Sequence, residues 1–179
     1  MEAPQRHPDT PPAGTPMGPH YARCFGCGPE QPHGLKLQVT VGEGVTVEAR
    51  LTVAEAHQGA PGLAHGGVIA AAFDEALGAL LWVVRQPAVT ARLTTTYRHP
   101  LPVGETLHIV AECTGISRRL IRTTARGWIG DSDGTLAAEA EALFAVVPLE
   151  HFTTFGRASE WEADSVRLHD RFLDASYNP

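Results

Sequence analysis

The sequence has few cysteines and no long apolar run, and each shortage excludes a class of protein. Its three cysteines are an odd number, which argues against a disulfide scaffold and favours a reducing compartment. No apolar run approaches the roughly 20 residues that span a bilayer, and the first residues lack the basic stretch and apolar core of a secretory signal. We therefore expect a soluble protein of the cytoplasm.

Positive charge is also scarce. The 14 basic residues form no long cluster and the formal net charge is −6, which argues against a nucleic-acid partner. A hydrophobic share of 43% and a charged share of 19% are ordinary for a globular protein, and 179 residues suffice for one domain with its own core. No internal repeat is visible, so one domain without a nucleic-acid or membrane partner is expected.

The two ends of the chain differ from its middle. Residues 1–20 contain six prolines and few apolar side chains, which predicts a flexible tail. Residues 149–179 are polar and charged, and residues 158–174 could form an amphipathic helix. The folded domain is therefore expected over residues 21–148, with a C-terminal extension that could pack on the sheet, cover a site or stay loose.

Alternating apolar residues indicate strands on both sides of a helical segment. Residues 35–41 and 45–51 alternate around Gly42-Glu43-Gly44, which predicts a β-hairpin, and residues 53–64 are expected to be a loop. Further strands are predicted at residues 88–99, 106–116, 119–130 and 135–147. The Ala/Glu-rich start of the last segment favours helix by propensity alone, but the turn before it and its apolar end favour a strand.

The most apolar segment runs from Val68 to Val84 and would make about five helical turns. Apolar residues occur on nearly every side, which predicts a helix buried all round. Two strands, one long helix and then four strands are typical of an α+β protein in which a helix packs against an antiparallel sheet.

Two acidic residues, Asp74 and Glu75, interrupt this apolar helix. A buried carboxylate without partners costs several kcal/mol, so such groups are paired, hydrogen-bonded or protonated. Adjacent helix positions lie about 100° apart, so the two side chains should have different surroundings and different roles. They could line a functional site, or they could lie on a solvated stripe or form salt bridges in a dimer contact.

The segment His65-Gly66-Gly67 ends a glycine-rich loop at the start of the same helix. Helix N-termini carry unpaired backbone N–H groups and the positive end of the helix dipole, and glycine lets a ligand approach the backbone. This arrangement suits an oxyanion that forms when a thioester carbonyl becomes tetrahedral. His65 alone is weak evidence, because a histidine before a helix is often a cap or a core residue.

The pair Cys24 and Cys27 has the Cys-x-x-Cys spacing. It could be half of a zinc site that recruits His20 or His33, a redox pair, or part of a compact turn. A second half is not apparent, and Cys113 stands alone in a predicted strand. We therefore expect a structural turn and neither a metal nor any other cofactor.

The spacing of His65-Gly66-Gly67, six residues, Asp74, then Glu75-Ala76 and Gly78 resembles the signature of PaaI-like hotdog-fold acyl-CoA thioesterases. Two more segments are similar to that family: Cys24 to Leu35, and Thr90 to Pro102. Together the three segments span roughly residues 22–148. The resemblance implies a hotdog fold, in which an antiparallel sheet wraps a central helix, and hydrolysis of acyl-CoA to free CoA and a carboxylic acid.

The resemblance also implies roles for single residues. Asp74 would be the general base or the nucleophile, and the Gly67 and Gly66 N–H groups would polarise the carbonyl. His65 would help to place the carbonyl, Glu75 would lie at the substrate, and Thr90 would supply a hydroxyl from the neighbouring subunit. The family implies sites shared between the subunits of a homodimer, often in a dimer of dimers.

Arginines suit the phosphates of CoA, and the candidates are Arg98, Arg118 and Arg119, although each could equally be an exposed charge at a strand end. The acyl chain would lie along the helix in a tunnel lined by residues such as Phe73, Leu77 and Trp82. Three alternatives remain: a hotdog dehydratase or hydratase, a non-catalytic acyl-CoA-binding protein, and a structural dimer with an incidental pocket.

Overall fold

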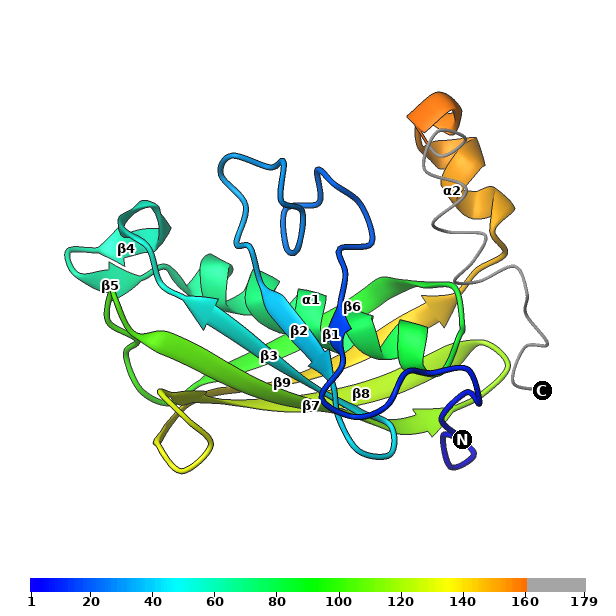
Figure 1. Cartoon of the computed structure of the whole chain (residues 1–179), viewed down its shortest axis with the longest axis horizontal. Helices are drawn as coiled ribbons and strands as arrows, with labels where there is room; N and C mark the ends of the chain where they lie inside the picture. Colours follow the sequence, from blue (N-terminus) through cyan, green and yellow to red (C-terminus); the bar gives the residue numbers. More distant parts are fainter. Residues whose placement is uncertain (161–179) are drawn as a thin grey trace.

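One long helix, α1 (Gly66–Val83), lies across one face of a seven-stranded antiparallel sheet in the computed structural model (Figure 1). The structure describes residues 1–160. The strands, in spatial order, are β1 (Pro16–Met17), β2 (Gln38–Val41), β3 (Thr46–Thr52), β7 (Thr106–Ile116), β8 (Leu120–Ile129), β9 (Thr135–Val146) and β6 (Ala88–Tyr97). This is the hotdog arrangement, so the predicted α+β fold is confirmed.

The predicted strands are present and pair as hairpins. β2 and β3 form the hairpin around residues 42–45, and β7, β8 and β9 form a continuous meander. The Ala/Glu-rich segment is strand β9, because alternate residues face the core and both of its edges are paired. The predicted loop differs in detail, since it holds the 3₁₀ helix η1 (Glu55–His57) and a small hairpin of β4 (Gln58–Ala60) and β5 (Leu63–Ala64).

The core lies between α1 and the sheet. Phe73, Leu77 and Leu80 of α1 are fully buried, and they face a sheet surface built from every second residue of the strands, such as Val47, Ala49 and Leu51 of β3. The prediction of a helix buried all round is wrong. Among the residues of α1 that the fold does not bury completely, five recur every three or four positions, namely Gly67, Ala71, Asp74, Gly78 and Trp82, and Gly66, Val68, Ala70 and Glu75 lie next to them. They form one uncovered stripe along the helix.

By length and composition α1 is apolar enough to cross a membrane, with a mean hydropathy of 1.5. Among the described residues it is the one helix that does so. Half of this segment is buried inside the fold, which is typical of the core helix of a soluble protein. The length and hydropathy of α1 are therefore weak evidence for a membrane span.

The first 20 residues differ from the predicted flexible tail. Glu2 exchanges backbone hydrogen bonds with Ile116 at the end of β7, and the His7 N–H donates to the Val83 carbonyl at the end of α1. Pro16 and Met17 form β1 on the edge of β2. The reason is that β2 and the end of α1 offer unpaired backbone groups, which this segment satisfies although its own side chains are poor in apolar surface.

The C-terminal extension begins with a short helix, α2 (Glu150–Phe155), which follows β9 and projects beyond the sheet in Figure 1. Most of the helix predicted at residues 158–174 lies outside the described residues. Of the extension, the structure therefore describes only the first part, which includes α2.

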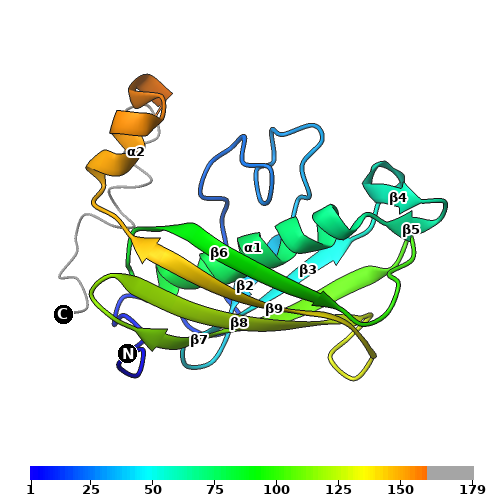
Figure 2. The ribbon, with the colours of Figure 1, turned by 180° about the vertical axis from the view of Figure 1, so that it is seen from behind.

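β6 forms one edge of the sheet, beside β9 (Figure 2). Ten residues long, it pairs on one side only among the described residues, and most of its side chains are exposed. A long edge strand of this kind offers a row of backbone groups to a second strand.

Candidate active site

Asp74 lies in the middle of α1, on the uncovered stripe, and is half-buried. The Thr90 hydroxyl, at the start of β6, donates a hydrogen bond to Asp74 Oδ1 at 2.9 Å. The pairing of β6 with β9 shifts register between Thr90 and Arg92, and such bulges turn a side chain out of the regular alternation. The resemblance predicted a hydroxyl from the neighbouring subunit, but in this structure Thr90 reaches Asp74 of its own chain.

The surroundings of Asp74 act on its pKa in opposite directions. Burial raises the pKa of the carboxyl, the hydrogen bond from Thr90 lowers it, and the negative charge of Glu75 raises it again. The net effect is a pKa above the ordinary value. Desolvation strengthens a carboxylate as a base, so this environment suits a group that accepts a proton or attacks a carbon.

A cavity of about 540 Å³ opens beside Asp74 and Thr90. Its walls are mostly apolar and come mainly from α1, the start of β6, the loop that begins at Gly18, and the region of α2, with single residues from β1, β2 and β9. The lining residues include Met17, His20, Tyr21, Cys27, Val39, Asp74, Glu75, Gly78, Trp82, Val89, Thr90, Phe144, Leu149 and Phe152. The C-terminal extension thus contributes to one wall of the cavity.

Of the three residues predicted to line an acyl tunnel, only Trp82 lines this cavity. Phe73 and Leu77 are fully buried in the core between α1 and the sheet. They lie on the opposite face of the helix from the uncovered stripe, because a helix that packs on a sheet turns its largest apolar side chains inward. The prediction for Phe73 and Leu77 is therefore wrong.

The N-terminus of α1 is organised by His65, which is its N-cap. The Gly67 N–H donates to His65 Nδ1 at 2.9 Å, and the Tyr97 hydroxyl donates to the Gly66 carbonyl at 2.8 Å. The Gly67 N–H can therefore polarise a ligand only if the His65 side chain turns away from it.

Helix geometry separates this end of α1 from Asp74. Asp74 is seven positions after Gly67 along the helix, which is a rise of about 10 Å. The residues that line the cavity, among those described, include Asp74 but none of His65, Gly66 and Gly67. One chain therefore does not bring both groups to a single carbonyl carbon.

The three candidate arginines lie at opposite ends of the sheet. Arg98 follows β6 and forms an ion pair with Glu139, whereas Arg118 and Arg119 are exposed in the turn before β8. The strand register separates them, since β8 begins opposite Ala145 and the far end of β6 lies opposite Ala138. Within one chain they do not converge on one phosphate group.

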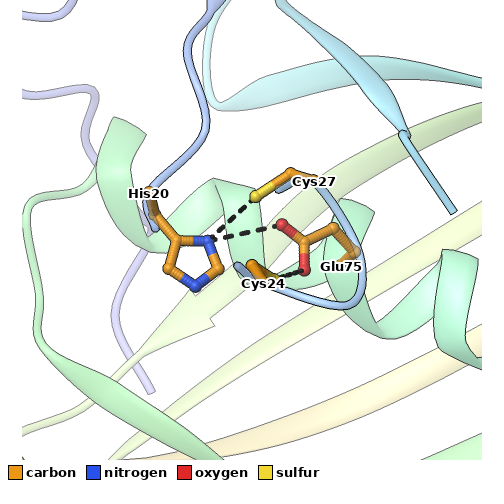
Figure 3. Close-up of side chains that lie close together, drawn as sticks. All are labelled: His20, Cys24, Cys27 and Glu75. Atoms are coloured by element: carbon orange, nitrogen blue, oxygen red, sulfur yellow. Dashed lines mark hydrogen bonds and ion pairs between the residues drawn. The ribbon is translucent and has the colours of Figure 1, made fainter. Parts of the chain in front are cut away.

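Glu75 points toward the loop that holds the Cys24–Cys27 pair (Figure 3), and it also lines the cavity beside Asp74. Its Oε2 lies 3.5 Å from Cys24 Sγ, its Oε1 lies 3.4 Å from His20 Nδ1, and that nitrogen lies 3.2 Å from Cys27 Sγ. The prediction that the two adjacent carboxylates have different surroundings is confirmed. Sequence reasoning considered His20 beside the cysteines but missed Glu75, because no local signal connects residues 51 positions apart.

Comparison with known proteins identifies a shared domain. A model of the thioesterase superfamily matches residues 61–135, which include His65, Asp74 and Thr90. The acyl-coenzyme A thioesterase THEM4 of Xenopus laevis is 36% identical over 87 residues, or 49% of this chain. The chain covers only 39% of that relative.

Solved structures show the same fold. The thioesterase superfamily protein RHA08564 is 29% identical, with a TM-score of 0.62 over 69% of this chain and 60% of that one. The PaaI protein of E. coli is 16% identical, with a TM-score of 0.58 over 64% of this chain and 81% of that one. Residues 61–135 thus match the thioesterase superfamily, and the helix and sheet described above form the hotdog fold that these solved structures share.

Proposed function

We propose that this protein hydrolyses acyl-CoA thioesters to free CoA and a carboxylic acid. The observation that carries the proposal is Asp74, a half-buried carboxylate oriented by the Thr90 hydroxyl at the wall of an apolar cavity. The match to the superfamily supports the reaction, and the THEM4 relative is named for it. A hotdog structure from Streptococcus mutans, 22% identical with a TM-score of 0.56 over 61% of this chain and 86% of that one, is bound to acetyl CoA.

In the general-base route, Asp74 accepts a proton from a water molecule while the water oxygen adds to the thioester carbon. The carbonyl oxygen becomes an oxyanion, which backbone N–H groups at a helix N-terminus stabilise. The C–S bond then breaks, and the CoA thiolate leaves and takes up a proton. In the nucleophilic route, Asp74 itself attacks the carbon and the C–S bond breaks with release of the CoA thiolate, which takes up a proton; water then hydrolyses the resulting mixed anhydride to the carboxylic acid and free Asp74.

The helix N-terminus that holds the oxyanion belongs to a second subunit in this proposal. Gly67 and Asp74 of one chain are about 10 Å apart along α1, too far to act on one carbonyl carbon. The uncovered stripe of α1 carries both residues. Thr90 belongs to β6, whose outer edge has no partner strand among the described residues. A twofold pairing at this surface would face Asp74 of one chain with the Gly66-Gly67 segment of its partner.

A shared site predicts a stable homodimer or a larger even assembly. Light scattering coupled to size-exclusion chromatography should give at least twice the 19.1 kDa mass of the chain. The mass should persist on dilution to the concentration used for activity measurements, since the site is incomplete in one chain. A 19.1 kDa monomer that still hydrolyses substrate would contradict the shared site.

The direct test of the function is release of CoA from a panel of short, long and aromatic acyl-CoAs. A thiol reagent follows the reaction after the signal of the protein's own cysteines is subtracted. We expect turnover of at least one substrate with a kcat on the order of 1 per second or more, as is usual for enzymes. Tight binding of acyl-CoA without any turnover would instead indicate a non-catalytic binding protein.

A further inference from the structure

The His20, Cys24, Cys27 and Glu75 cluster is a second constellation of chemical groups, separate from Asp74 (Figure 3). Each of the four side chains offers one ligand atom, and these four atoms lie within 4.8 Å of one another. Three come from the loop that begins at Gly18, and one comes from α1. The hydrolytic mechanism uses none of the three loop residues, so their convergence needs another explanation.

We propose that these four side chains form a structural zinc site, with two thiolates, one imidazole and one carboxylate as ligands. Zinc prefers four ligands in a tetrahedron, drawn from cysteine, histidine and carboxylate groups, and Cys-x-x-Cys is a common spacing for two of them. The site is closed, because the protein itself supplies all four ligands. It is also distinct from catalysis, since Asp74 Oδ1 is engaged by Thr90.

The separations between the side chains fit this geometry. Zinc bonds of 2.0–2.3 Å at tetrahedral angles place neighbouring ligand atoms about 3.3–3.8 Å apart. In the structure, Cys27 Sγ and His20 Nδ1 are 3.2 Å apart, Glu75 Oε1 lies 3.4 Å from His20 Nδ1, and its other oxygen, Oε2, lies 3.5 Å from Cys24 Sγ. Small shifts would bring all four atoms around one ion.

The backbone of the turn has the features of a thiolate site. The Gly26 N–H donates to Cys24 Sγ at 3.3 Å, and the Gly28 N–H donates to the Cys24 carbonyl at 2.9 Å. Backbone donors of this kind orient a metal-bound sulfur and stabilise its negative charge. A Cβ at Gly26 would lie 2.2 Å from Glu75 Oε2, so the absence of a side chain there lets the turn approach the helix.

The proposed zinc would fasten the loop to α1. The Leu35 and Leu37 N–H groups donate to the carbonyls of Phe25 and Gly26, which holds the other side of the turn to the start of β2. His20 and Cys27 also line the cavity beside Asp74. The metal would therefore fix one wall of the substrate cavity, at a position next to the catalytic carboxylate in the chain.

The test is the metal content of the full-length protein, purified without a histidine tag and dialysed against a weak chelator. Elemental analysis should find about one zinc ion per chain in the wild type. Cys24→Ser and Cys27→Ser should lose nearly all of it, while Cys113→Ala, whose thiol is buried in β7, should keep it. Glu75→Gln, which leaves both thiols intact, should weaken zinc binding by at least about tenfold, since even outer-shell changes cost that much.

Cobalt gives a second readout that does not depend on activity or on the stability of one variant. Metal-free wild type titrated with Co²⁺ should show thiolate-to-cobalt charge transfer and the visible bands of a tetrahedral site, and Cys27→Ser should lose the charge transfer. Free thiols with no zinc bound after incubation with the ion would overturn the proposal. So would a Cys24–Cys27 disulfide in the freshly isolated protein, or equal zinc in the wild type and Cys27→Ser.

Discussion

Asp74→Asn should lower kcat for acyl-CoA hydrolysis by about 100- to 10,000-fold, the usual contribution of a positioned acid or base. The amide has the shape of the carboxylate and can still accept the hydrogen bond that Thr90 donates at 2.9 Å, so the fold and the cavity should remain. It cannot accept a proton or attack a carbon at neutral pH. KM should change only a few-fold, because the substrate is held by the rest of the cavity.

The measurement is steady-state thiol release with the best substrate of the panel, on wild type and variant of matched thermal stability. Two substitutions of Thr90 provide controls. Thr90→Val removes the hydroxyl and should lower kcat by about 10- to 150-fold, as for one hydrogen bond to a charged group, and Thr90→Ser should restore most of that loss. Equal rates in wild type and Asp74→Asn would remove Asp74 from the mechanism.

Phe73→Ala should lower the free energy of unfolding by about 3–5 kcal/mol, the cost of a cavity left by a buried aromatic ring. Phe73 is 0% exposed and packs between α1 and the sheet, one residue before Asp74. Urea denaturation followed by circular dichroism, at one fixed protein concentration, measures the change. Phe155→Ala is the matched control, since Phe155 is 79% exposed and its loss should cost roughly 0.5 kcal/mol or less.

Gly127 of β8 tests the same contact from the side of the sheet. A Cβ at this position would lie 2.9 Å from the tip of the Phe73 ring, so Gly127→Ala should destabilise the protein by about 1–3 kcal/mol. In a Phe73→Leu background the ring tip is gone and the penalty should shrink. Additive effects of the two substitutions would contradict direct packing of Phe73 on Gly127.

Most of the helices and strands were predictable from the sequence, because the patterns that indicate them are local. Alternation gave the β2–β3 hairpin and the later strands, and the apolar run gave α1. The N-terminal segment was not predictable in the same way. Its prolines and polar residues indicate a free tail, and only the edge of β2 and the ends of β7 and α1 give Glu2, His7 and Pro16 their partners.

The candidate site was also predictable only in part. Composition singled out Asp74 and Glu75 as carboxylates in an apolar helix, and spacing along that helix predicted that they would face different surroundings. The identity of those surroundings required the fold: Thr90 is 16 positions from Asp74, and Cys24 is 51 positions from Glu75. Which helix face meets the sheet also decided that Phe73 is a core residue while Trp82 lines the cavity.

The sequence by itself therefore determined the order of the elements, the helix that carries the acidic pair, and the glycine-rich segment at its start. These follow from periodicity and backbone preference, which act over a few residues. The tertiary structure alone decided that Glu75 completes a cluster with His20, Cys24 and Cys27, and that Asp74 faces a cavity beyond reach of its own helix N-terminus. Such contacts depend on how distant segments pack together, and no local pattern encodes that.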